Sequence, residues 1–201
     1  MRCTNLLFDF PALLLVACTA CSSAAGTASA PAPTESTAPK GYTAADVQFM
    51  QGMIGHHAQA LAMSGLIAGR TRREDFRSLG ERIRLSQEAE ISRMQQWLRK
   101  RNAEVPDGTA HSHVAAGHGT LMPGMLSAAE MAQLEVANGT EFERLFLQGM
   151  IKHHEGALAM VRQLFATPGA GQDPDLYMLA NDIDADQNAE LRRMRTLLAK
   201  F

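Results

Sequence analysis

The sequence FMQGMIGHHAQALAM at residues 49–63 recurs almost unchanged as FLQGMIKHHEGALAM at residues 146–160. Eleven of the fifteen positions are identical, and the identities include two adjacent histidines and two methionines. A second match follows each histidine pair, SQEAEISRMQQWL at 86–98 and DQNAELRRMRTLL at 186–198. The chain therefore contains an internal duplication, which predicts a scaffold built from two similar halves.

The spacing of apolar residues predicts that both halves are helical. Thr43 with Asp46 has the spacing of a helix cap, and so has Ser127 with Glu130. Pro174 is suited to the first turn of a last helix. No window alternates between apolar and polar residues with a period of two, so no β-sheet is expected. We expect four long helices and one short helix, over about residues 43–68, 72–102, 140–166, 175–200 and 127–138.

The predicted fold is therefore all-α, a four-helix bundle made of two duplicated helical hairpins with a long crossover between them. The first repeat spans residues 43–102, the crossover 103–139 and the second repeat 140–200. Residues 43–201 are thus expected to fold as one duplicated bundle.

The amino terminus has the features of an export signal. Arg2 is followed by an apolar run that ends in Leu-Val-Ala-Cys, which fits a lipoprotein signal peptide over residues 1–17 with Cys18 acylated after cleavage. Ordinary secretion with cleavage after Ala30 is the alternative. Both interpretations predict an exported protein of the periplasm or cell envelope. Residues 18–42 are rich in small residues and proline, which predicts a disordered tether.

Charge and cysteine content exclude other classes of function. The formal net charge is −2, and the basic clusters at 70–73 and 99–101 lie at predicted helix ends. Cations are favourable near helix C-termini, so no nucleic-acid partner is expected. No cysteine follows Cys21, so the folded part has neither a disulfide nor a thiolate ligand. Any metal site must use histidine, methionine or carboxylate.

The repeated histidines and methionines share one face of their helices. On each histidine-containing helix they fall within an arc of about 120°, and the next helix adds one methionine on its inner stripe. Imidazole with thioether and without thiolate favours copper, as Cu(I) or Cu(II), over zinc or calcium. The candidate metal ligands are Met53, His56, His57, Met63, Met94, Met150, His153, His154, Met160 and Met194.

The second helix of each hairpin also directs a carboxylate and an amide inward. An unpaired buried carboxylate is costly, and a metal-binding imidazole usually donates its other N–H to a carboxylate. Gln87 and Glu90, with their counterparts Gln187 and Glu190, are therefore predicted to orient the histidines of their own hairpin. Adjacent histidines diverge by about 100°, so one of each pair can bind metal while the other makes a hydrogen bond. Methionines at helical spacing also serve simply as core.

The crossover offers a second, less specific copper site. Its candidate ligands are His111, His113, His118, Met122 and Met125. A loop rich in histidine and methionine can capture copper, although loop histidines also occur without any ligand.

Three motifs carry a resemblance to a known family. They are GMI-x-HH-x-x-ALAM, present twice, MPGMLS at 122–127 and FERLFLQGMIKHH at 142–154. Over about residues 43–199 the chain resembles the bacterial family called domain of unknown function 305. The resemblance implies a ferritin-like fold, export, and a role in copper binding and copper tolerance.

Two other functions are open alternatives. A ferritin-like di-iron oxidase needs Glu-x-x-His motifs and more inward carboxylates than Glu90 and Glu190, and the chain contains no Glu-x-x-His. A lipid-anchored structural bundle would bind a partner protein and keep its histidines buried and hydrogen-bonded. Besides a metal ion and a membrane reached through Cys18, a second copy of the chain or a copper-delivery protein is a candidate partner.

Overall fold

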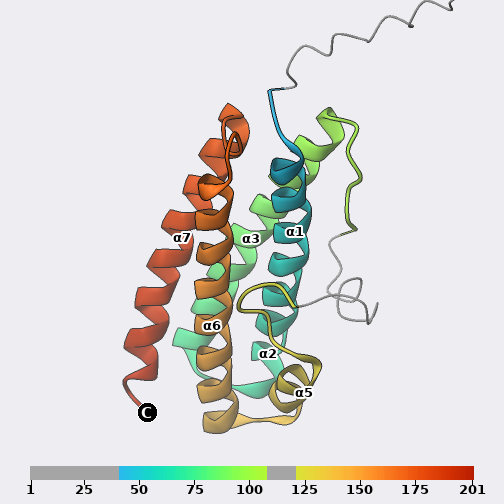
Figure 1. Ribbon diagram of the computed structural model, residues 1–201. Helices are drawn as coiled ribbons and strands as arrows, with labels where there is room; N and C mark the ends of the chain where they lie inside the picture. Colours follow the sequence, from blue (N-terminus) through green and yellow to red (C-terminus); the bar gives the residue numbers. More distant parts are fainter. Residues whose placement is uncertain (1–40, 108–120) are drawn as a thin grey trace, which may run out of the picture. The chain divides into compact units, whose positions relative to one another are not determined.

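The computed structural model describes residues 41–107 and 121–201 (Figure 1). Within these two ranges every regular element is a helix and there is no β-strand, which confirms the all-α fold. The helices are α1 (Ala44–Gly65), α2 (Ile67–Arg70), α3 (Glu74–Lys100), α5 (Ala128–Val136), α6 (Gly139–Ala166) and α7 (Pro174–Leu198). None of the helices in the described residues has the length and apolar composition needed to span a bilayer.

Two of the helices, α1 and α5, begin at the capping pairs that the sequence predicted. Thr43 accepts a hydrogen bond from the Asp46 N–H at 3.2 Å, and the Asp46 carboxylate accepts from the Thr43 N–H at 2.7 Å. Ser127 and Glu130 form the same reciprocal pair at the start of α5. Asp173 caps α7 by accepting from a backbone N–H of its first turn at 3.1 Å. These side chains satisfy N–H groups that have no partner within the helix.

The first hairpin differs from the prediction at its turn. A single helix was expected to about residue 68, but α1 ends at Gly65 and α2 follows as a separate turn. The N–H of Leu66 bonds to the carbonyl of Met63, three residues back, and this tighter turn interrupts the helix. Arg73 keeps an extended backbone, so α3 begins at Glu74 and not near residue 72.

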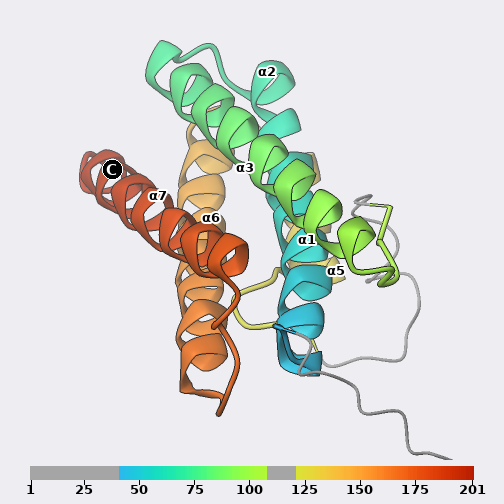
Figure 2. The same ribbon diagram turned by 90° about the horizontal axis from the view of Figure 1, so that it is seen from above.

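The four long helices pack as two hairpins side by side. α1 lies against α3, and α6 lies against α7. α1 also contacts α6, while α3 contacts α7. Figure 2 shows α3 and α7 crossing in front of α1 and α6. The two repeats therefore meet along two seams, one between α1 and α6 and the other between α3 and α7.

The bundle interior consists of two apolar clusters with polar residues between them. One cluster includes Phe76, Leu79, Ile83, Phe142, Phe146 and Leu197, and the other includes Phe49, Ile54, Leu98, Val161, Leu176 and Ile183. Each long helix contributes residues to both clusters. The polar side chains that separate the clusters come from one helical turn of each long helix, within residues 56–57 of α1, 87–90 of α3, 153–154 of α6 and 187–190 of α7.

One end of the bundle is closed by a polar and aromatic cluster. The Trp97 indole N–H donates to Asp173 at 2.9 Å, and Arg101 donates to the same carboxylate. The Arg101 guanidinium lies 4.0 Å from the Trp97 ring centroid, and the Tyr42 ring meets that ring edge-on at 5.4 Å. The cluster ties α3 to the start of α7.

Candidate metal centre

The four helical histidines meet in the middle of the bundle. His56 and His57 on α1 and His153 and His154 on α6 have no solvent-exposed surface. The His56 and His153 rings face each other across the α1/α6 seam, with centroids 3.8 Å apart and planes tilted by 38°. The duplication therefore brings equivalent residues of the two repeats into contact. Together with the inward residues of α3 and α7 they form a polar layer of His56, His57, Gln87, Glu90, His153, His154, Gln187 and Glu190.

The carboxylates of the polar layer contact the histidines of their own hairpins. His57 Nε2 lies 2.6 Å from Glu90 Oε2, and His154 Nε2 lies 2.6 Å from Glu190 Oε2. This is the contact that the sequence predicted. An ionised carboxylate only accepts, so each Nε2 donates, and in a neutral ring Nδ1 then carries the free lone pair.

The polar layer leaves many of its own atoms without partners. In the described part of the chain, eleven buried side-chain nitrogen and oxygen atoms have no hydrogen-bond partner, and nine of them belong to this layer. Five are imidazole nitrogens, namely Nδ1 of His56, His57 and His154 and both nitrogens of His153. The amide of Gln87 also makes no hydrogen bond, so its predicted contact with a histidine is not formed. Unpaired buried groups are rare and costly, and their concentration in one layer indicates a missing partner.

Burial keeps the two central histidines uncharged. Removal from water lowers the pKa of His56 from 6.5 to about 3, although the bond to a backbone carbonyl acts in the opposite direction. Burial, followed by the nearby imidazoles, also lowers the pKa of His153 well below its usual value. Both rings are therefore neutral at pH 7, and neutral imidazole is the form that binds metals.

The six candidate methionines of the helices lie on the two sides of the polar layer. Five are completely buried, and Met160 is partly exposed. One apolar cluster contains Met63, Met150 and Met194, and the other contains Met53 and Met94 with Met160 packed against it. The two sets are counterparts under the duplication. Each set combines methionines from both repeats, so the halves of one chain are intermixed on each side of the histidines.

Residues 122–126 of the crossover, which we call the strap, cover the seam between α1 and α6. In Figure 1 the strap crosses these two helices just before α5. The carbonyl of Pro123 accepts a hydrogen bond from His56 Nε2 at 2.9 Å. The Gln59 side-chain amide donates to the Leu126 carbonyl at 2.9 Å and accepts from the Leu126 N–H at 2.8 Å. The sequence prediction missed this role of Pro123 and Gln59.

The strap also depends on a close backbone approach to α6. A Cβ atom added at Gly156 would lie 1.9 Å from the Pro123 carbonyl oxygen, and one at Gly124 would lie 2.4 Å from the Lys152 carbonyl oxygen. Gly124 also has a φ of +75°, which favours glycine. Position 156 is the counterpart of Gln59 in the duplication. The repeats thus differ at this position. In the first repeat the Gln59 amide binds the strap, and in the second the absence of a side chain at Gly156 lets the strap backbone approach α6.

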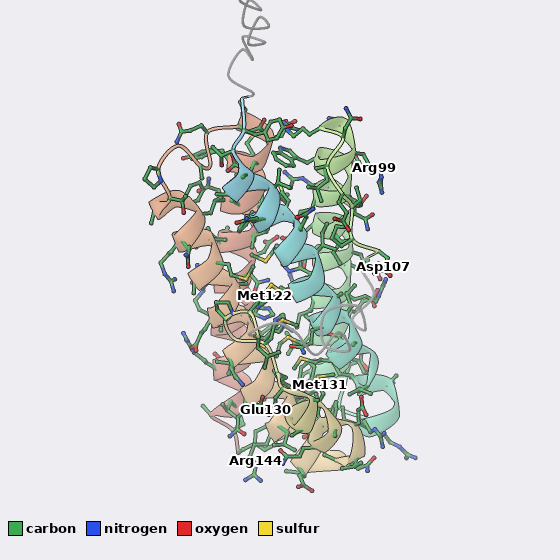
Figure 3. All side chains as sticks on the ribbon, turned by 45° about the vertical axis from the view of Figure 1, so that its right-hand side comes forward. Arg99, Asp107, Met122, Glu130, Met131 and Arg144 are labelled. Carbon is green, nitrogen blue, oxygen red and sulfur yellow. The ribbon has the colours of Figure 1, made fainter. Side chains whose placement is uncertain are left out.

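Only part of the predicted crossover site falls within the described residues. Met122 lies halfway along the bundle (Figure 3), and its sulfur is 3.3 Å from the place that a Cβ on Gly52 would occupy. The Met160 methyl group lies 3.6 Å from the same place. Met125, a residue of the strap, is buried. His111, His113 and His118 lie outside the described residues, as do the predicted signal peptide, Cys18 and most of the tether.

The polar layer does not form a metal cage of nitrogen and oxygen ligands alone. In residues 41–107 and 121–201, no three His, Cys, Asp or Glu side chains group closely enough to hold one metal ion. Imidazole and thioether groups are both buried in the interior. The histidine pairs and the methionine sets are thus the donors that the interior supplies.

Comparisons with known proteins agree with this architecture. The chain is similar to the solved structure of a DUF305 fragment from Deinococcus radiodurans, with 32% identity and a TM-score of 0.67 over 80% of this chain and 99% of that chain. A DUF305 protein from Streptomyces coelicolor is 31% identical, with a TM-score of 0.65 over 78% of this chain and 93% of its own.

A third solved structure is CopM in its Cu(II)-bound form. It is 26% identical to this chain, with a TM-score of 0.62 over 77% of this chain and 96% of that chain. No protein with a curated description matches the sequence significantly. The family model described as "Domain of unknown function (DUF305)" matches residues 46–198, which include both histidine pairs and the strap. The chain therefore belongs to the DUF305 family.

Proposed function

We propose that this protein is an exported copper-binding protein that buffers copper or confers tolerance to it. The observation that carries the proposal is the set of five unpartnered imidazole nitrogens in a fully buried layer between two sets of methionines. Buried polar atoms of this kind require a partner, and a metal ion is a partner for an unprotonated ring nitrogen.

The donors present fit copper better than other common metals. The described residues contain no cysteine, and the interior offers imidazole and thioether, which suit copper. Because no three histidine or acidic side chains group around one point, a site in this layer would combine imidazole nitrogen with methionine sulfur. The proposed ligands are His56, His57, His153 and His154 through their free nitrogens, together with methionines of the two sets.

The carboxylates would orient the proposed ligands. Glu90 and Glu190 fix the Nε2–H of His57 and His154, which directs each Nδ1 lone pair away from the carboxylate. Such a partner also makes the imidazole a more basic ligand. CopM was solved with Cu(II) bound and has a similar fold at 26% identity, which supports copper as the cargo.

The proposed location is the periplasm or cell envelope. The amino-terminal residues 1–17 have the pattern of a lipoprotein signal, so we propose a lipid anchor at Cys18 followed by a tether over residues 18–42. A membrane and a copper-delivery protein are the partners that this location implies.

A competition titration tests copper binding. Purified wild-type protein and the double variant His57→Ala/His154→Ala are titrated with Cu(I) against a chromophoric chelator, and bound metals are measured by mass spectrometry. We expect the wild type to compete with the chelator and the double variant to lose most of its affinity. The matched control replaces the three histidines of the crossover, His111, His113 and His118, with alanine and should retain the high-affinity site.

The crossover is tested separately. Deletion of residues 109–120 should lower the copper stoichiometry if these histidines add a weaker site, without lowering the melting temperature. An unchanged stoichiometry would remove the crossover site from the proposal and leave the helical site intact.

A structural role without metal is the second candidate function. It is favoured by the 2.6 Å bonds of His57 and His154 to carboxylates, which already give each ring one partner. If the wild type neither competes for copper nor carries iron, the copper and di-iron proposals both fail and the structural role is supported.

A further inference from the structure

The seam between α3 and α7 contains a groove that reaches the polar layer. Its volume is about 450 Å³, and it is lined by Arg82, Ser86, Asp186, Ala189, Glu190 and Arg193. Glu190 is the buried carboxylate that holds His154. The groove thus connects the surface of the bundle with one half of the layer.

The opposite seam is covered. Between α1 and α6 the strap bonds to His56 and Gln59 and lies in backbone contact with Gly156. Within each hairpin the two helices pack directly against each other. A cavity of about 230 Å³ beside the strap is lined by Pro123 and Met160 but by no residue of the polar layer. The α3/α7 groove is lined by Glu190, so the layer can communicate with solvent there.

The duplication explains why the groove lies over Glu190 and not over its counterpart. On the Glu90 side, Arg93 of α3 bonds to Asp182 of α7 at 2.7 Å and bridges the seam. The equivalent positions on the Glu190 side are Arg193 and Arg82. Two cations cannot form this bridge, and among the described residues neither of them has an ion-pair partner.

The cavity near the bridged side supports this difference. It has a volume of about 250 Å³ and is lined in part by Arg93, Trp97 and Met178, but neither Glu90 nor His57 lines it. The groove is lined both by Ser86, whose hydroxyl donates to Glu190 at 3.4 Å, and by its counterpart in the second repeat, Asp186. The lining of the groove thus combines two carboxylates, Asp186 and Glu190, with two guanidinium groups, Arg82 and Arg193.

We propose that the α3/α7 groove is the route by which water and copper reach the buried histidines, with Asp186 at its mouth and Glu190 at its floor. The His154–Glu190 half is then the access side of the layer, and the Arg93–Asp182 bridge closes the His57–Glu90 half. The copper part of this inference rests on the proposed function, and the water part does not.

Substitution of Arg82 separates closure of the groove from simple electrostatics. Arg82→Asp lets a carboxylate pair with Arg193 in the geometry that Asp182 and Arg93 adopt. A surface bridge is worth up to about 1 kcal/mol, so Cu(I) uptake and release in stopped-flow should both slow by about twofold to fivefold. If charge alone mattered, the added carboxylate would accelerate uptake of a cation.

Two matched variants complete the kinetic test. Arg82→Gln removes the cation without creating a bridge, so uptake should stay at the wild-type rate or rise. Arg82→Asp/Arg193→Ala cannot form the bridge and should recover fast uptake. Uptake by Arg82→Asp that is as fast as, or faster than, that of the wild type would overturn the route for copper.

A copper-free measurement tests access by water. Deuterium exchange at the imidazole C2 position, followed by mass spectrometry, reports solvent access to individual histidines. His154 should exchange faster than His57 in the wild type, and Arg82→Asp should bring the His154 rate down toward that of His57. Equal wild-type rates would overturn the groove as a route, even if the protein binds copper. If the wild type binds no copper, the proposed function fails while this exchange still decides the access of water.

Discussion

Replacing Gly156 with alanine should disrupt the contact between the strap and α6. The added Cβ would lie 1.9 Å from the Pro123 carbonyl oxygen and 2.6 Å from the Gly124 Cα. Both neighbours are backbone atoms, so neither can rotate away as a side chain would. The strap must therefore shift, and the hydrogen bonds that it makes to His56 and Gln59 shift with it.

The expected change in the free energy of unfolding is the sum of one favourable and two unfavourable contributions. Alanine in a helix interior is favoured over glycine by about 1 kcal/mol. Overpacking costs about 1–3 kcal/mol, and the three strap hydrogen bonds contribute about 1 kcal/mol each. The free energy of unfolding should fall by about 3–5 kcal/mol. For a domain of this size the melting temperature should then fall by roughly 6–20 °C.

Urea unfolding followed by circular dichroism measures this loss. Gly65→Ala is the matched control, because a Cβ there meets nothing within 4 Å. It should leave stability unchanged or raise it by up to about 1 kcal/mol. Gly149→Ala meets only side-chain atoms at 3.1–3.6 Å and should cost less than Gly156→Ala. If Gly156→Ala unfolds within 1 kcal/mol of the wild type, the tight packing of the strap on α6 is refuted.

Three further predictions concern the histidines, their carboxylates and the end of the bundle. His56 has a pKa of about 3 when folded and 6.5 when unfolded, so protonation favours the unfolded chain. The contribution of His56 to the free energy of unfolding is therefore complete above pH 6.5 and is lost as the pH falls toward 3. At pH 5 the loss is about 2 kcal/mol. Between pH 7 and pH 5 the free energy of unfolding, measured with urea, should therefore fall less for His56→Gln than for the wild type. Equal falls would contradict this. Glu190→Gln should weaken copper binding by about 10–100-fold in the chelator competition, whereas the exposed control Glu155→Gln should not, and an unchanged affinity of Glu190→Gln would argue against an orienting role. Asp173→Ala removes the cap of α7 and the acceptor of the Trp97 N–H, so urea unfolding should show a loss of about 2–4 kcal/mol; a loss below 1 kcal/mol would show that the cluster contributes little.

Features that depend on local spacing could be predicted from the sequence. Thr43 with Asp46 and Ser127 with Glu130 are reciprocal caps whose partners lie three residues apart, and both are present in the structure. The contact between His57 and Glu90 was predictable for a similar reason. A short turn folds the two helices back on each other, so inward residues at the same height must meet.

Features that depend on packing between the repeats could not be predicted in the same way. The sequence identified the six helical methionines but not their division into two sets, because that division depends on which helices face each other across the seams. The break at Leu66 also has no strong signal beyond the preceding glycine. The methionines, too, can be grouped only once the positions of α1 and α6 are known.

The strap was missed because a backbone carbonyl carries most of its contact with the histidines. Pro123 offers no side-chain chemistry that marks it as a partner of His56. The useful signal was the disagreement between the repeats. Gln59 and Gly156 occupy the same place in nearly identical segments, and such a mismatch indicates that the two halves have different neighbours.

That mismatch has a consequence for the centre of the molecule. Two separate copies of one hairpin, related by exact twofold symmetry, would offer any covering segment two identical faces. In the fused chain a single segment can dock in only one orientation, with an amide on one side and bare backbone on the other. His56 therefore has a hydrogen bond to the strap that its counterpart His153 lacks. The two rings at the centre are therefore not interchangeable, because one has a nitrogen bonded to the strap and the other has two unpaired nitrogens.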